Sequence, residues 1–122
     1  MNYASGVCNI GPAEIARRRR AGHGGVLVTV ALLAILLWID ADPAWRLLVA
    51  IPAAGAAAGY LQATFRFCAN FGFRGVYNFG ELGSVERVAL EGARARDRRK
   101  ALLIGFGSVA IGVAIALGSL AL

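Results

Sequence analysis

The sequence predicts an all-α integral membrane protein with three transmembrane helices. Of its 122 residues, 58% are hydrophobic and 16 are glycine, which is high for a water-soluble domain. Crossing about 30 Å of hydrocarbon takes roughly 20 mainly apolar residues in a helix. Three runs approach or reach that length: residues 22–39, 44–65 and 101–122. We therefore expect a single membrane domain that spans residues 1–122.

An amphipathic helical segment is expected ahead of the first span. Pro12 suits the first position of a helix, and Glu14 in the first turn meets the positive end of the helix dipole. The four arginines Arg17–Arg20 follow and suit lipid phosphates. We interpret the segment as a membrane-surface anchor, with a specific anionic-ligand site as the alternative. His23 is interpreted as an interfacial residue, the alternatives being a titrating group or a metal ligand.

The first two spans are predicted to form an antiparallel hairpin. Residues 22–39 could also be the apolar part of a signal peptide, but residues 39–43 offer no Ala-x-Ala-like cleavage site and a second apolar run follows at once. A retained span is therefore favoured. Asp40 and Asp42 are interpreted as a solvated turn rather than as paired carboxylates for acid–base chemistry.

Small residues recur in the second and third spans at separations of three and four. This spacing places them on one helix face and lets another helix backbone approach closely, which favours association in lipid. The residues expected to pack helices together are Gly55, Gly59, Gly105, Ser108 and Gly112. The two faces either pack against each other within one chain, or one of them binds a second copy or another membrane protein.

The segment between the second and third spans combines aromatic residues, glycines and cations. Its aromatic and glycine-rich first part predicts a loop at the membrane surface rather than a continuous helix. Ser84 is then a plausible N-cap for a basic helix over residues 84–100. Because nothing in residues 94–100 breaks a helix, this segment can run directly into the third span.

The distribution of cations predicts the orientation. Of the 13 Lys and Arg residues, only Arg46 falls in the connection between the first two spans. Lys and Arg near span ends are retained on the cytoplasmic side. We therefore expect a bacterial inner-membrane protein with its N-terminus in the cytoplasm and its C-terminus outside. Anionic lipid headgroups, rather than nucleic acid, are the expected partners of the basic groups. The residues assigned to headgroups and topology are Arg17, Arg18, Arg19, Arg20, Arg98, Arg99 and Lys100.

The two cysteines are the strongest candidates for chemistry, because both fall on the predicted cytoplasmic side. A disulfide is disfavoured in a reducing compartment, so the alternatives are reactive thiols, metal ligands or buried small apolar side chains. Cys8 lies just before a predicted helix start, and Cys68 lies between Arg66 and Arg74. Both settings favour a thiolate. The ligand-binding residues we predict are Cys8, Cys68, Arg66 and Arg74.

Enzyme motifs are missing from the sequence. There is no C-x-x-C or H-x-x-x-H pair, no phosphate-binding glycine loop after a strand and no nucleophile elbow. We therefore expect no catalytic residue, no metal and no cofactor. The leading hypothesis is a small non-enzymatic protein, expected to form a homo-oligomer or to belong to a larger membrane complex, that binds or passes a thiol-reactive, sulfur or small anionic species. The alternatives are an accessory subunit of a larger membrane complex and a metal-handling protein.

Several short motifs resemble a known membrane domain. Asn9-Ile10-Gly11 and the arginine run precede a helical hairpin, and Phe67-Cys68 with a glycine-rich turn follow it. This order resembles the small transmembrane domain found after a rhodanese module in some bacterial sulfurtransferases, over about residues 8–75. The chain departs from that family in having Ala69 where proline is frequent, no rhodanese module, and residues 84–122 without a counterpart. The resemblance implies a hairpin that handles sulfur or small anions near Cys68.

Overall fold

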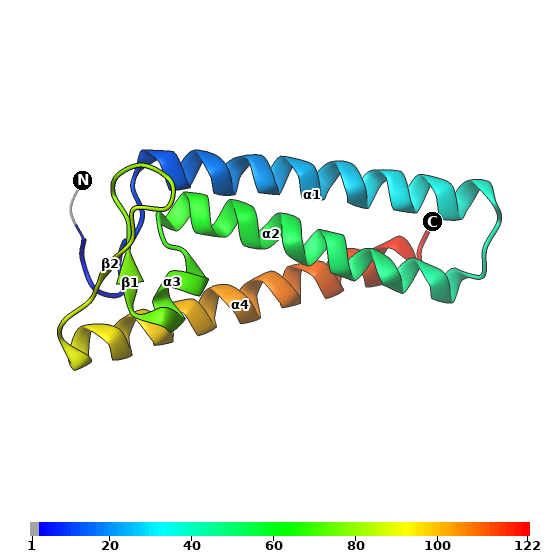
Figure 1. Cartoon of the computed structure of the whole chain (residues 1–122). Helices are drawn as coiled ribbons and strands as arrows, with labels where there is room; N and C mark the ends of the chain where they lie inside the picture. The colour runs from blue at the N-terminus through cyan, green and yellow to red at the C-terminus, as the bar shows by residue number, and fades with distance from the viewer. Residues whose placement is uncertain (1–2) are drawn as a thin grey trace.

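The computed structural model describes residues 3–122, which are mostly helical (Figure 1). The elements in chain order are α1 (Pro12–Trp38), the 3-10 helix η1 (Pro43–Val49), α2 (Ala50–Phe65), α3 (Ala69–Arg74), β1 (Val76–Tyr77), β2 (Glu86–Arg87) and α4 (Glu91–Ser119). The prediction of an all-α fold is confirmed, with one short antiparallel hairpin added to it. Three helical segments are long and apolar enough to cross a membrane: Pro12–Trp38, Pro43–Phe65 and Glu91–Ser119.

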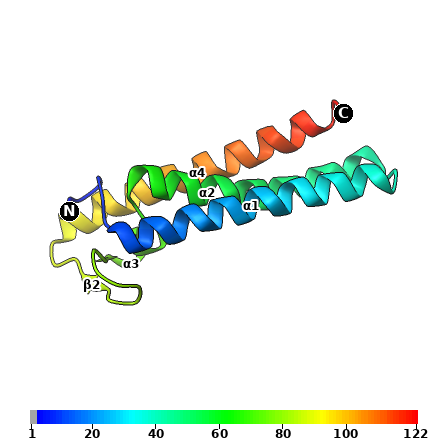
Figure 2. The same cartoon turned by 90° about the horizontal axis from the view of Figure 1, so that it is seen from above.

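The long helices form an open layer in which α2 lies between α1 and α4 (Figure 1). The helix α3, the two strands and the N-terminal residues gather at one end, and the connection from α1 to η1 lies at the other. Figure 2, turned by 90°, shows the C-terminal part of α4 diverging from α1 and α2. Large apolar side chains such as Leu27 and Phe106 are exposed on the outer helix faces, with 71% and 72% of their surface accessible.

Two helix boundaries differ from those expected. The predicted surface segment and the first span are one continuous helix, α1, because the glycines around His23 do not interrupt it. The helix predicted to start after Ser84 instead begins at Glu91, because Glu86 and Arg87 pair with β1. From Glu91 the helix runs into the third span without a break, as the sequence predicts.

Glycines set the close approach of the long helices. A Cβ atom added to Gly59 would lie 2.6 Å from the backbone nitrogen of Gly22, and one added to Gly25 would lie 2.7 Å from Cα of Ala56. On the other side of α2, a Cβ atom added to Gly112 would lie 2.6 Å from the carbonyl oxygen of Ala50. Such contacts are shorter than van der Waals separation, so only glycine allows these backbones to pack as they do.

Gly55 and Gly105 do not take part in this packing within the chain, which leaves the predicted contact with a second copy or another membrane protein as their alternative. Both are exposed, and an added Cβ atom would have no neighbour within 4 Å among the described residues. In α4 the buried face contains Ile104, Ser108 and Gly112, spaced four residues apart. Gly105 follows Ile104 and is therefore turned by about 100° around the helix axis, which removes it from that face.

The N-terminal residues are attached to α4 through a buried carboxylate. Asp97 is fully buried and accepts hydrogen bonds from the Tyr3 hydroxyl at 2.6 Å and from the Gly6 backbone N–H at 2.7 Å. Burial and the hydrogen bond to Asp97 raise the pKa of Tyr3 above its usual value, so the phenol stays protonated and continues to donate. Tyr3 also stacks on Tyr77 of β1 at a ring separation of 4.8 Å.

Arg46 contacts the last turn of α4 at the opposite end of the molecule. Its guanidinium donates hydrogen bonds to the carbonyl oxygens of Leu122 at 3.0 Å and Ser119 at 3.4 Å. Carbonyl groups in the last turn of a helix have no partner within the helix. Arg46 therefore ties η1 to the end of α4.

Candidate anion-binding site

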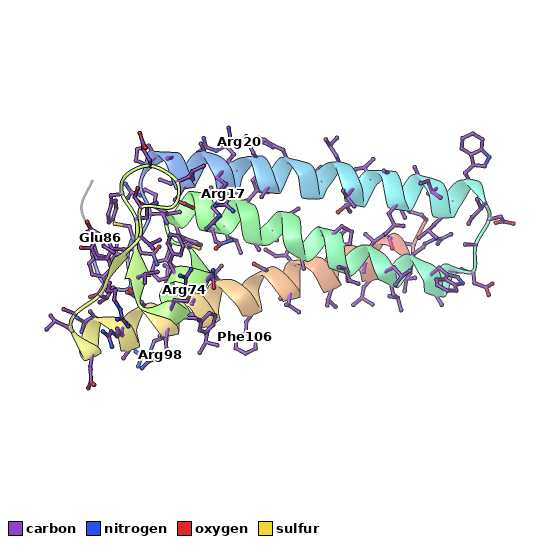
Figure 3. All side chains as sticks on the ribbon, in the orientation of Figure 1. Arg17, Arg20, Arg74, Glu86, Arg98 and Phe106 are labelled. Carbon is purple, nitrogen blue, oxygen red and sulfur yellow. The ribbon has the colours of Figure 1, made fainter. Side chains whose placement is uncertain are left out.

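Charged side chains gather at the end of the molecule that contains α3 and the strands. Figure 3 shows Arg17, Arg20, Arg74, Glu86 and Arg98 at this end, whereas Phe106 projects from the outer side of α4 farther along the helix. The N-terminal residues before α1, helix α3, the two strands and the loop between them form a polar folded unit at this end (Figure 1), which we call the cap. The candidate site lies in the cap, next to the apolar helices.

The segment around Asn9 joins three parts of this cap. The backbone N–H of Asn9 donates a hydrogen bond to the carbonyl oxygen of Arg66 at 3.1 Å, and the carbonyl oxygen of Asn9 accepts one from the N–H of Asn78 at 2.9 Å. The N–H of Gly11 in turn donates to the carbonyl of Asn78 at 2.8 Å. A Cβ atom on Gly11 would lie 2.7 Å from the carbonyl oxygen of Phe79, so the close approach of these two segments requires glycine.

The side chain of Asn9 holds Cys68 by both of its backbone polar groups. Its Oδ1 atom accepts from the Cys68 N–H at 2.7 Å, and its Nδ2 atom donates to the Cys68 carbonyl at 3.2 Å. Asn9 and Cys68 are both buried, and Ile10 packs with Cys68, Phe71 and Val76 in a small apolar cluster. This network fixes the turn between α2 and α3 against the start of α1.

Arg18 connects this turn to α1. Its Nη2 atom donates a hydrogen bond to Sγ of Cys68 at 2.8 Å and lies 3.2 Å from Oε2 of Glu14. The guanidinium carbon also lies 5.8 Å from the centre of the Phe71 ring, which is within cation–π range. The side chain of Glu14 is only 1% exposed. Arg18 is thus held in place by a sulfur atom, a carboxylate and an aromatic ring.

A cavity of about 360 Å³ opens beside this cluster. Its walls come from α1, α3 and the loop that joins the strands. The lining residues are Glu14, Arg17, Arg18, Asn70, Phe71, Arg74, Gly83 and Val85. Three arginines and one glutamate are therefore among the residues that line the cavity. Guanidinium groups bind carboxylate, phosphate and similar oxyanions through charge-assisted hydrogen bonds, so the cavity suits a small anion.

The structure brings together only part of the ligand-binding set that the sequence predicts. Arg74 lines the cavity, but Arg66 does not. Arg66 ends α2 in the left-handed backbone conformation, with φ of 54°, and its side chain is exposed. Cys68 is 1% exposed and is not among the lining residues. Cys8 is also buried, in the turn that begins at Ala4, and no disulfide joins these two described cysteines.

Asn9, Glu14 and Arg18 are site residues that the sequence reasoning missed. The sequence predicts that Glu14 acts as a helix-end charge and that Arg18, like its neighbours, binds lipid headgroups. Glu14, Arg18, Gly22 and Gly25 are four, four and three residues apart, which places them on one face of α1. Because Gly22 and Gly25 approach α2 closely, that same face turns Glu14 and Arg18 inward. This spacing was the available signal.

The other predicted headgroup cations lie outside the cavity. Arg19, Arg20, Arg98 and Arg99 are exposed, and the Lys100 ammonium lies 4.3 Å from the centre of the Phe65 ring. His23, in α1, is hydrogen-bonded to the hydroxyl of Tyr60 at 2.6 Å. Within residues 3–122, no group of three His, Cys, Asp or Glu side chains is arranged to hold a metal ion.

No family model, curated protein or solved structure matches the chain. The fold and the cavity together define a small helical protein in which three helices long and apolar enough to cross a membrane carry an arginine-rich cap at one end.

Proposed function

We propose that this chain is a small, non-enzymatic, multi-pass protein of a bacterial inner membrane that binds a small anion at its cytoplasmic end. The length and composition of its three long helical segments support membrane insertion. So do their exposed apolar faces, because lipid would remove this surface from water. The observation that carries the binding function is the cavity with three guanidinium groups and one carboxylate.

The charges support an orientation for the proposed membrane protein. Twelve of the 13 Lys and Arg residues lie before Gly22 or between α2 and the apolar part of α4. Arg46 is the exception, and it lies near the opposite end, bonded to the end of α4. Because cations near span ends are retained in the cytoplasm, the cap with the cavity would be cytoplasmic and the C-terminus would be outside.

Cysteine labelling in intact cells tests this orientation. Asp42→Cys, in the exposed connection between α1 and η1, is expected to react with a membrane-impermeant maleimide added from outside. Ser84→Cys, in the exposed loop of the cap, is expected to react only after permeabilisation. The native chain is the background control, because Cys8 and Cys68 are 7% and 1% exposed. Labelling of Ser84→Cys but not Asp42→Cys in intact cells would reverse the proposed orientation.

The position of Cys68 favours binding over thiol chemistry as the role of this site. Its sulfur accepts a hydrogen bond from Arg18 and its side chain is enclosed, whereas the guanidinium groups of Arg17 and Arg74 line the cavity. We therefore assign Cys68 the role of holding Arg18 in position. Sulfur oxyanions and phosphate present similar oxygen acceptors to guanidinium groups, so a sulfur-containing anion belongs to the same ligand class.

Removal of the two outer arginines is expected to weaken anion binding. The double variant Arg17→Gln/Arg74→Gln should bind inorganic phosphate and sulfate about tenfold or more weakly, because it loses two charge-assisted contacts that are each weakened by exposure to water. Calorimetric titration of the detergent-solubilised protein measures this change. Arg20→Gln is the matched control, since Arg20 is an exposed arginine of the same helix that does not line the cavity.

The same titration separates binding from thiol chemistry. Cys68→Ser retains an acceptor for Arg18 and should keep most of the anion affinity, whereas Cys68→Ala removes the acceptor and should lower it. Equal loss in both variants would show that the thiol itself is required. Unchanged affinity in the arginine double variant would contradict the proposed binding function.

A further inference from the structure

Glu14 places a buried carboxylate among the arginines of the cavity, and a site that only attracts anions does not need one. Its side chain is 1% exposed and lines the cavity beside Arg17 and Arg18. The Nη2 atom of Arg18 lies 3.2 Å from Oε2 of Glu14 and forms an ion pair with it, whereas its hydrogen bond goes to Sγ of Cys68. Among residues 3–122, no group donates a hydrogen bond to Oε2 of Glu14. The site therefore contains a buried carboxylate oxygen that is ion-paired but accepts no hydrogen bond from residues 3–122.

A buried acceptor without a donor is unfavourable, because it has lost its hydrogen bonds to water. A fully deprotonated anion would make this cost larger, because it brings a second acceptor and a like charge to the same place. An anion that carries its own O–H would instead donate to Oε2 of Glu14 while its other oxygens accept from the arginines. Inorganic phosphate keeps at least one proton at neutral pH, whereas sulfate keeps none.

We infer that the ligand of this cavity is a protonated oxyanion of the phosphate type, recognised by donation of its O–H to Glu14. This inference rests on the proposed anion binding and adds the chemical class of the ligand. Free inorganic phosphate and the singly protonated, monoanionic form of a lipid phosphomonoester headgroup share the required chemistry. Sulfate and phosphodiesters lack the O–H and are discriminated against.

Titration of the full chain in detergent at neutral pH and constant ionic strength tests the preference. Phosphate is expected to bind at least about tenfold more tightly than sulfate. In Glu14→Gln, the side-chain amide supplies a donor, so the phosphate-to-sulfate affinity ratio should fall towards one. The ratio is the informative quantity, because removal of a negative charge strengthens the binding of any anion. An unchanged ratio in Glu14→Gln would overturn the role of Glu14.

The native protein alone provides a second test that does not depend on folding of a variant. Arsenate keeps a proton as phosphate does and should bind like phosphate, whereas selenate should bind like sulfate. Equal affinities for all four anions would overturn the preference and leave anion binding intact. Absence of binding for all four would overturn the proposed function itself.

Reconstitution into lipid nanodiscs distinguishes the two sources of phosphate. Phosphatidate in the disc should weaken the apparent binding of free phosphate if a lipid headgroup is the ligand, and phosphatidylmethanol, an anionic diester whose headgroup has no hydroxyl group, should not. No competition by either lipid would assign the site to soluble phosphate. Equal competition by both lipids would overturn the requirement for an O–H.

Discussion

Replacement of Gly59 by alanine is expected to lower the stability of the protein by about 1–3 kcal/mol and to weaken anion binding at the same time. The added Cβ atom would lie 2.6 Å from the Gly22 nitrogen and 2.7 Å from the Arg18 carbonyl oxygen. Both neighbours are backbone atoms of α1 and cannot rotate away. Helix α1 must therefore move from α2 at the turn that carries Arg18, which disturbs both the packing and the cavity.

Gly55→Ala provides the matched control for this prediction. It makes the same change in the same helix, but the added atom has no neighbour within 4 Å among residues 3–122. Alanine also favours the helix over glycine by up to about 1 kcal/mol, so the midpoint of thermal unfolding should stay the same or rise. Circular dichroism in detergent micelles measures both variants. Equal midpoints for Gly55→Ala and Gly59→Ala would refute the proposed contact between α1 and α2.

Asn9→Ala is expected to destabilise the cap by about 2–4 kcal/mol, because it leaves the N–H and the carbonyl of Cys68 buried without their side-chain partner. Alanine is also smaller and leaves a void among buried groups. Cys68 should then become more accessible, which the rate of its reaction with a maleimide would report. Anion affinity should fall with it, since Cys68 holds Arg18.

Asn70→Ala is the comparison for this variant, because it makes the same change at an exposed position in α3. It should change neither the unfolding midpoint nor the rate of cysteine labelling. If Asn9→Ala labels as slowly as Asn70→Ala, the hydrogen bonds of Asn9 do not hold the turn at Cys68.

The sequence predicts the long helices well because their length and apolar content are local properties. The continuous run of α4 into the third apolar segment follows from the absence of any helix-breaking residue in 94–100. The residue at which α4 begins could not be predicted from such local properties. Its position depends on the pairing of Glu86 and Arg87 with β1, ten or so residues earlier in the chain, and two-residue strands carry no periodic pattern.

The contacts around the candidate site could be predicted only in part, for a related reason. Cys68 was identified, but the arginine that contacts its sulfur is 50 residues away rather than beside it. Arg66 is adjacent in sequence, yet the left-handed turn at this residue leaves its side chain exposed. The spacing of Glu14, Arg18 and Gly22 on one helix face carried the relevant signal. It was hidden by the run of four arginines, which has a simpler explanation as a surface charge cluster.

The bonds from Tyr3 and Gly6 to Asp97 have a consequence for how the chain is inserted. In the proposed membrane protein, two crossings separate these residues from Asp97, so the N-terminal turn and the start of α4 meet on the same side of the bilayer. A chain that fails to insert α1 or α2 places the two partners on opposite sides, and Asp97 then lacks both donors. The contact thus cannot form in a molecule that has lost one of the two crossings.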